Sequence, residues 1–212
     1  MNFFRFDSPF WRGINKAVFV LYTGFLWFLG SIPVVTMGAS TSALLEVLMK
    51  MAKNQEGYIG AAFFRAWKSN LKQGLKLGIP LMLVTVVFGV NAFYYGVLGG
   101  KAFWVQTVLF LVLLTFALGL WVYVFAVTAR FENSAGDTFR MAVVLLFRNL
   151  GWTLVIVLIQ LLTLFLCCFF VYFPILFITG ISGYAQACIF NHIFDRLIED
   201  GGIQEKNREG LS

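Results

Sequence analysis

Few side chains in this sequence could take part in chemistry, and they are widely spaced. Glu46 is the only carboxylate in a long apolar stretch, and an ionisable group in such a setting is costly to bury. It therefore marks a candidate functional position. The four-residue spacing from Glu46 to Lys50 also fits an ordinary ion pair on one face of a helix. Glu46 is thus either a functional carboxylate or one half of a local ion pair.

No metal centre or catalytic centre is expected. His192 is the only histidine, whereas a zinc site needs three or four ligands, so His192 fits a hydrogen-bonded cap near a helix end better. The sequence has no phosphate-binding glycine loop, no His-Glu-x-x-His motif and no Ser/His/Asp set. We therefore expect no enzyme activity, no cofactor and no metal. The cysteines lack a Cys-x-x-Cys spacing and lie in apolar surroundings: Cys167, Cys168 and Cys188.

Uncharged polar side chains could line a path for a polar solute. Asn91 and Gln160 interrupt long apolar stretches, and Gln106 and Gln186 have the same setting. Such groups more often join helices through hydrogen bonds. The candidate functional polar residues are Glu46, Asn91, Gln160 and His192.

Membrane-spanning helices are the elements that would position these side chains. Of 212 residues, 60% are hydrophobic and 12% charged, against about 45–50% and 25% in soluble domains. Residues 77–100 and 102–129 carry no charge, and each stretch fits one helix of about 20 residues across a hydrocarbon core of roughly 30 Å. Their apolar runs do not alternate as barrel strands do. We predict an all-α transmembrane bundle: one domain over residues 1–198 and a polar tail over 199–212.

A third charge-free stretch, residues 149–194, is about twice as long as a single span. Pro174 lies near its middle, and proline is tolerated in the first turn of a helix but not in its interior. We therefore predict a tight hairpin with one helix from Trp152 to about Phe170 and a second from Pro174 to about Phe194.

The number of spans depends on the short segment Met37–Ala52. If it crosses, fifteen of the sixteen Lys and Arg residues fall on one face, and only Lys101 falls on the other. If it does not cross, the charges divide nine to seven and set no orientation. Because Lys and Arg favour the cytoplasmic side, we predict six spans arranged as three hairpins, with both termini cytoplasmic. A re-entrant Met37–Ala52 segment would give the same charge distribution.

The stretch Tyr58–Lys76 has the pattern of an amphipathic interfacial helix. Apolar residues recur at helical spacing on one side, and basic residues gather opposite. We expect it either to lie on the lipid surface or to dock a cytoplasmic partner. The residues that would form this surface are Arg65, Trp67, Lys68 and Lys72. The segment Glu132–Arg148 is predicted as a second cytoplasmic connection, capped by Asn133 or Ser134.

Small residues could allow two helices to pack closely at two places. Ala39–Ala43 is the better packing face, whereas the Gly-x-x-x-Gly spacing at Gly74 and Gly78 is a weak signal because it lies at the interface. The isoelectric point near 9.4 agrees with contact to anionic cytoplasmic lipid. Nucleic acid is not expected as a partner, because the chain has no basic soluble domain.

Three segments resemble the YesL family of bacterial integral membrane proteins: Ser31–Leu44, Glu56–Ile59 and Phe63–Gln73. The Ser-x-Pro-Val-x-Thr-x-Gly-Ala-Ser run within the first is the most specific. The family is a domain of unknown function whose members are typically encoded beside carbohydrate-uptake ABC transporters. The resemblance carries over no catalytic or ligand residue.

The resemblance implies a protein of the bacterial cytoplasmic membrane that serves carbohydrate uptake. We expect an accessory subunit bound to the permease of a carbohydrate ABC importer. One alternative is a stand-alone permease for a sugar or another small solute, acting alone or as a homo-oligomer. A third alternative, that the chain is itself an ABC permease subunit, lacks a recognisable Glu-Ala-Ala coupling sequence at the right spacing.

Overall fold

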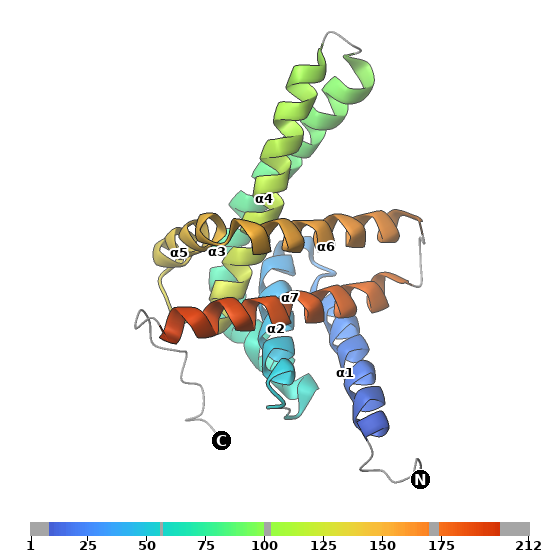
Figure 1. Cartoon of the computed structure of the whole chain (residues 1–212), viewed down its shortest axis with the longest axis vertical. Coiled ribbons are helices and arrows are strands. Elements are labelled where there is room, and N and C mark those ends of the chain that lie inside the picture. The colour runs from blue at the N-terminus through green and yellow to red at the C-terminus, as the bar shows by residue number, and fades with distance from the viewer. Residues whose placement is uncertain (1–8, 56, 100–102, 170–173, 200–212) are drawn as a thin grey trace.

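The computed structural model describes residues 9–55, 57–99, 103–169 and 174–199, and within them the chain is helical with no β-strand. This confirms the predicted all-α class (Figure 1). Two short elements flank the long helices: the 3-10 turn η1, Val34–Thr36, and the π-helix η2, Tyr94–Leu98. The long helices are α1 (Pro9–Gly30), α2 (Met37–Ala52), α3 (Ile59–Phe93), α4 (Trp104–Arg130), α5 (Ala135–Arg148), α6 (Leu150–Phe169) and α7 (Pro174–Glu199).

Helix α2 forms the centre of the protein. Twelve of its sixteen residues are buried, and it packs against α1, α3, α4 and α7. The largest buried side chains around it include Tyr123 and Phe125 of α4 and Phe190 of α7. The short segment whose crossing was ambiguous in the sequence is therefore the helix on which the others assemble.

Glycines bring α2 and α3 into close contact. A Cβ atom on Gly74 would lie 2.7 Å from the backbone nitrogen of Ala39, and one on Gly38 would lie 2.6 Å from Phe125 Cζ. Gly78 is also buried and faces Gly38. The Gly74–Gly78 spacing is therefore a true packing motif, contrary to the weak weight that the sequence analysis gave it.

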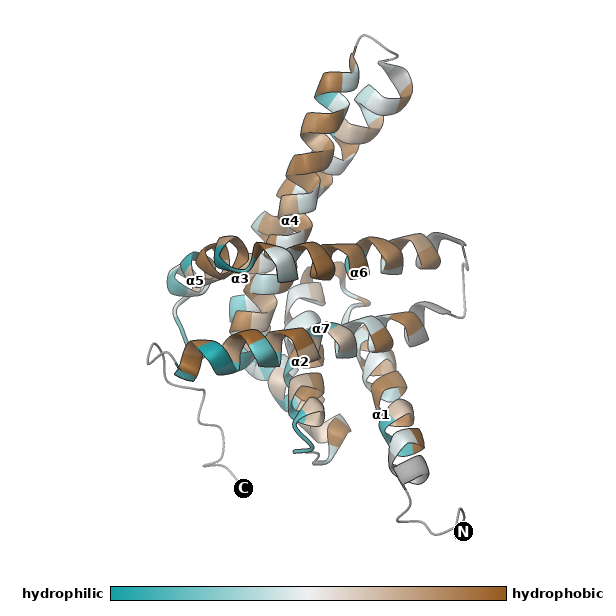
Figure 2. Cartoon of the chain, in the orientation of Figure 1, coloured by the Kyte–Doolittle hydropathy of each residue, from teal (hydrophilic) through white to brown (hydrophobic). Residues whose placement is uncertain are grey.

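The outer halves of α3 and α4 form a hairpin that projects beyond the other helices (Figure 1). Their side chains there are apolar yet exposed, for example Leu83, Val90 and Val105. Helix α6 exposes a second apolar face that includes Leu154 and Leu158. In Figure 2 the ribbons of α6 and of the projecting part of α4 are mostly brown. Exposed apolar area of this extent marks contact with lipid or with another protein.

Four helices in the described residues are long and apolar enough to span a membrane, and a bent pair could supply a fifth. The four are α1, η1 with α2, α3 with η2, and α4; the pair is α5 with α6, between which the chain bends by 102°. The predicted six spans are therefore not confirmed. The three-hairpin arrangement is not confirmed either, since α1 has more extensive contact with α7 than with α2.

The predicted interfacial helix Tyr58–Lys76 is not a separate element. Helix α3 runs from Ile59 through Pro80 to Phe93 without a break. Its apolar face, with Ile59 and Phe63 buried, packs against α2 instead of lying on lipid. The correction follows from the close approach at Gly74, which lets protein cover a face that periodicity alone assigns to the membrane.

The second amphipathic helix is α5. Its N-cap is Ser134, one of the two predicted residues, whose Oγ accepts a hydrogen bond of 3.2 Å from the backbone N–H of Asp137. Helix α7 begins at Pro174, as predicted. Three further predictions concern parts outside the described residues: the turn over 170–173, the outer location of Lys101, and the tail beyond Glu199.

Candidate functional site

The four predicted polar residues do not form one site. Glu46 is buried and its carboxylate lies 3.6 Å from Lys50 Nζ, the arrangement expected of a local ion pair. Asn91 donates a hydrogen bond of 2.8 Å to the carbonyl of Val87 in its own helix. His192 is exposed, with its ring 5.8 Å from that of Trp152. Gln160 lines a cavity between the helices.

This cavity, of about 210 Å³, lies between α1, α2, α4, α6 and α7. We call it the bundle cavity. Its lining combines two indole rings with amide and hydroxyl groups on apolar walls. The side chains that give it this character are Trp27, Thr41, Trp121, Gln160, Ser182 and Gln186.

The amide groups of the bundle cavity lie on facing helices. Gln186 Nε2 of α7 donates a hydrogen bond of 3.2 Å to Gln160 Oε1 of α6, and Gln186 is buried. Ser182 lies one turn before Gln186, with the same face of α7 turned to the cavity. The spacing of Thr179, Ser182 and Gln186, three and then four residues apart, is therefore a sequence signal for a polar face of α7.

Each indole ring of the cavity is held by a contact with a neighbouring side chain. Trp27 Nε1 donates a hydrogen bond of 3.2 Å to Thr41 Oγ1, which joins α1 to α2. The ring of Trp121 packs edge-on against Phe125, with 4.8 Å between ring centroids. Each indole of the cavity wall is thus held by a contact with another side chain.

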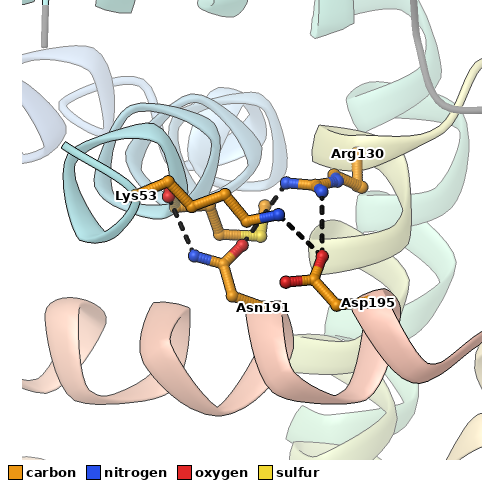
Figure 3. Close-up of polar contacts among 5 residues, drawn as sticks. Lys53, Arg130, Asn191 and Asp195 are labelled. Atoms are coloured by element: carbon orange, nitrogen blue, oxygen red, sulfur yellow. Dashed lines mark hydrogen bonds and ion pairs between the residues drawn. The ribbon is translucent and has the colours of Figure 1, made fainter. Parts of the chain in front are cut away.

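A second polar cluster joins the ends of α2, α4 and α7 (Figure 3). Asp195 Oδ1 accepts hydrogen bonds from Lys53 Nζ at 2.7 Å and from Arg130 Nη2 at 3.2 Å. Asn191 accepts from Arg130 at 3.4 Å and donates to the carbonyl of Met49 at 2.9 Å. We call these residues the ion cluster. Its members lie far apart in the chain, so no local sequence pattern predicts the cluster.

The bundle cavity and the ion cluster draw residues from the same parts of the chain. On three helices a residue lining the cavity comes nine residues before a member of the cluster. At 1.5 Å per residue, this spacing corresponds to about 13–14 Å along each helix. The pairs are Leu44 of α2 with Lys53, which directly follows that helix, Trp121 and Arg130 on α4, and Gln186 and Asp195 on α7.

The predicted basic surface is present on α3, with one exception. Arg65, Lys68, Lys72 and Lys76 are exposed, and we call them the basic stripe. Trp67, which was predicted to belong to this surface, instead contacts α2, where its Nε1 donates a hydrogen bond of 3.2 Å to Ser40 Oγ.

Comparison with known families gives one match. The model of a family described as "Protein of unknown function, DUF624" matches residues 20–92, which run from α1 to the end of α3 and include the basic stripe. No curated protein and no solved structure matches this chain. The similarity therefore covers about a third of the chain and assigns it no activity.

Proposed function

We propose that this chain is a multi-pass protein of the bacterial cytoplasmic membrane that serves carbohydrate uptake. Its role is that of an accessory subunit bound to the permease of a carbohydrate ABC importer. The resemblance to the YesL family through Ser31–Leu44 leads to this role, and the family match over residues 20–92 includes that segment.

Membrane location is supported by the surface of the molecule. The exposed apolar side chains of α3, α4 and α6 form a surface so large that the protein would be insoluble in water. In a bilayer they meet lipid without cost, and the helices satisfy their own backbone hydrogen bonds.

The proposed orientation places the ion cluster at the cytoplasmic end. Lys16 Nζ near the start of α1 donates to Asn54 Oδ1 at 3.1 Å, just beyond the end of α2. Lys53 follows α2, and Arg130 ends α4, so basic residues from several helices gather at one end of the bundle. By the positive-inside rule this end faces the cytoplasm, with both termini on that side and six crossings in all.

The basic stripe is the observation that carries the accessory role. Helix α3 contains no Asp or Glu, so nothing within the helix offsets its charge. Its opposite face is fixed on α2 by Phe63, Gly74 and the hydrogen bond of Trp67. A rigid cationic ridge at the cytoplasmic side can bind an acidic protein surface at a small entropic cost.

Co-purification from the native bacterium tests this role. The tagged full chain is expressed during growth on a plant polysaccharide, extracted in mild detergent, and its partners are identified. We expect carbohydrate ABC permease subunits in stoichiometric amount. Recovery of the chain alone, or only with copies of itself, would contradict the accessory role.

A charge-reversed variant shows which surface is responsible. Lys68→Glu combined with Lys72→Glu should remove most of the co-purified permease. The matched control is Arg140→Glu combined with Arg196→Glu, which makes the same charge change at exposed positions of α5 and α7. Equal loss in both double variants would mean that net charge, and not the basic stripe, governs association.

A stand-alone permease is the second candidate, and the bundle cavity is the observation that favours it. Transporter sites are commonly built near the membrane midplane between several helices, and five helices line this cavity. Uptake of a labelled sugar into proteoliposomes that contain only this chain would establish this role in place of the accessory one.

A further inference from the structure

The bundle cavity has a chemical character that selects one class of ligand. Among the residues that the structure describes, its lining has no charged side chain. A charged ligand would therefore leave its charge unpaired in an apolar setting, which is strongly unfavourable. A wholly apolar ligand would offer no hydrogen bond to the amides of Gln160 and Gln186, whose one described hydrogen bond joins them to each other.

The amide pair offers both kinds of hydrogen-bonding group. The contact between Gln186 and Gln160 uses one N–H and one carbonyl oxygen. It leaves the NH2 group of Gln160 and the carbonyl oxygen of Gln186 without a hydrogen bond to any described residue. Because a hydroxyl group donates and accepts at once, two adjacent hydroxyls match this pair of groups.

The hydroxyl side chains of the lining add acceptors. The O–H of Thr41 donates to the carbonyl of Met37 at 2.8 Å, and that of Thr163 donates to Ile159 at 2.7 Å. Both donors are thus occupied within their own helices. Thr41 Oγ1 also accepts from Trp27, so it has one lone pair left for a ligand's O–H group, whereas Thr163 has two. Apolar ligands gain nothing from this arrangement.

The two indoles supply a complementary surface. The face of an aromatic ring carries partial negative charge and attracts the polarised C–H groups of a ligand. A sugar ring presents C–H groups on its faces and hydroxyls at its edge, so it can meet Trp27 or Trp121 and the amides together. The volume of about 210 Å³ lies below the roughly 300–1,000 Å³ of sites for drug-sized ligands, which limits the occupant to one ring.

We propose that the bundle cavity binds one neutral sugar ring, by stacking on Trp27 or Trp121 and hydrogen bonding to Gln160 and Gln186. The choice of a sugar among neutral polyhydroxylated molecules rests on the proposed role in carbohydrate uptake. The accessory subunit would then sense or hand over the sugar that the importer moves, in addition to docking on the permease.

Saturation-transfer NMR tests the proposal on the full chain in phospholipid nanodiscs, which avoids detergents with sugar headgroups. The probes are glucose, galactose, mannose, xylose, arabinose and rhamnose, with glucuronate and glucosamine as charged counterparts. We expect at least one neutral sugar to bind in saturable fashion, with its ring C–H protons receiving the strongest transfer, and the charged sugars to bind at least tenfold more weakly.

Two pairs of variants, each with a matched control, test whether binding occurs in the cavity. Gln160→Leu combined with Gln186→Leu removes both amides together, so neither is left unpaired and folding should be preserved. We expect at least tenfold weaker binding, a loss of 1.4 kcal/mol or more. Gln106→Leu makes the same change at an exposed position of α4 and should bind as the natural chain does. Trp121→Leu should likewise weaken binding, whereas Trp104→Leu at an exposed site should not.

Three results would overturn the proposal: no saturable binding of any neutral sugar below about 10 mM, equal binding of the charged sugars, or unchanged binding by the Gln160 and Gln186 double variant. These outcomes are separate from the fate of the accessory role. If the chain binds sugar but no permease co-purifies with it, the cavity proposal is supported and the accessory role is wrong. If permease co-purifies but no sugar binds, the accessory role is supported and the cavity proposal is wrong.

Discussion

The Arg130 guanidinium of α4 reaches the Asp195 carboxylate of α7 at 3.2 Å, although 65 residues separate them in the chain. Arg130 is 7% exposed, so its charge must be balanced within the protein. The same carboxylate oxygen accepts from Lys53 at 2.7 Å. One aspartate of α7 therefore binds both the end of α4 and the residue that directly follows α2.

Asp195→Asn should lower stability. The asparagine keeps the shape of the side chain but removes the charge that balances Arg130 and Lys53. Because Asp195 is itself partly exposed, we expect a loss of about 1–2 kcal/mol and not the larger cost of a fully buried pair. Thermal unfolding in detergent measures it, with Glu199→Gln at an exposed position of α7 as the matched control. Equal stability of the two variants would contradict a structural role for the ion cluster.

Gly74→Ala should destabilise the contact between α2 and α3. The new Cβ would lie 2.7 Å from Ala39 N and 2.9 Å from Ala39 Cα, and backbone atoms cannot move aside as a flexible side chain can. Overpacking of this kind costs about 1–3 kcal/mol. The measurement is the unfolding temperature together with the yield of monodisperse protein.

Gly89→Ala is the control for that change, since it lies on the same helix with nothing within 4 Å of the added atom. Alanine favours a helix over glycine by up to about 1 kcal/mol, so this variant should be as stable as the natural chain or more so. A Gly74→Ala protein that matched it would show that α2 and α3 do not approach as described.

Thr153→Val should loosen the contact between α4 and α6. Thr153 Oγ1 lies 3.0 Å from the Tyr123 hydroxyl and 2.9 Å from the carbonyl of Leu146, and it is buried. Loss of this hydroxyl leaves buried polar groups with fewer partners, at a cost of about 1 kcal/mol. Thr115→Val serves for comparison, because that hydroxyl bonds only to the carbonyl of Leu111 in its own helix. Both are compared by thermal unfolding, and a smaller loss at Thr153 than at Thr115 would contradict the account.

Sided cysteine labelling tests the proposed orientation. In a chain whose three cysteines are replaced by alanine, Lys72→Cys should react with a membrane-impermeant maleimide only after the membrane is opened. Trp104→Cys, near the start of α4, should react in intact cells. Reaction of both from the same side would show that the outer halves of α3 and α4 do not cross the membrane.

The helical class and most helix positions followed from the sequence, because charge-free stretches in a membrane protein admit little besides helices. The central position of α2 in the bundle did not follow from the sequence. Its Gly-Ala-Ser-Thr-Ser-Ala start looks too polar for an ordinary span, and only the packing of Gly38 and Ala39 on Gly74 shows why small residues are there. Helical periodicity identifies an apolar face but cannot say whether lipid or protein covers it.

For Trp67, too, the sequence alone could not tell whether lipid or protein covers the side chain. An aromatic residue beside basic residues is typical of the membrane interface, yet its indole N–H is bonded to Ser40. The bundle cavity was also only partly predictable: Gln160 was singled out, while its partner Gln186 was noted only among polar groups of the spans. Pairings between distant helices such as α6 and α7 leave little trace in a single sequence.

The central claim, a permease-docking basic stripe on α3, is tested most directly by site-specific photocrosslinking in living cells. A photoreactive benzoylphenylalanine replaces Lys68 in one strain and, as control, the exposed Arg140 of α5 in another. The account predicts that Lys68 crosslinks to a subunit of a carbohydrate ABC permease and that Arg140 does not. Crosslinks from Lys68 to lipid alone, or to a second copy of this chain, would contradict it.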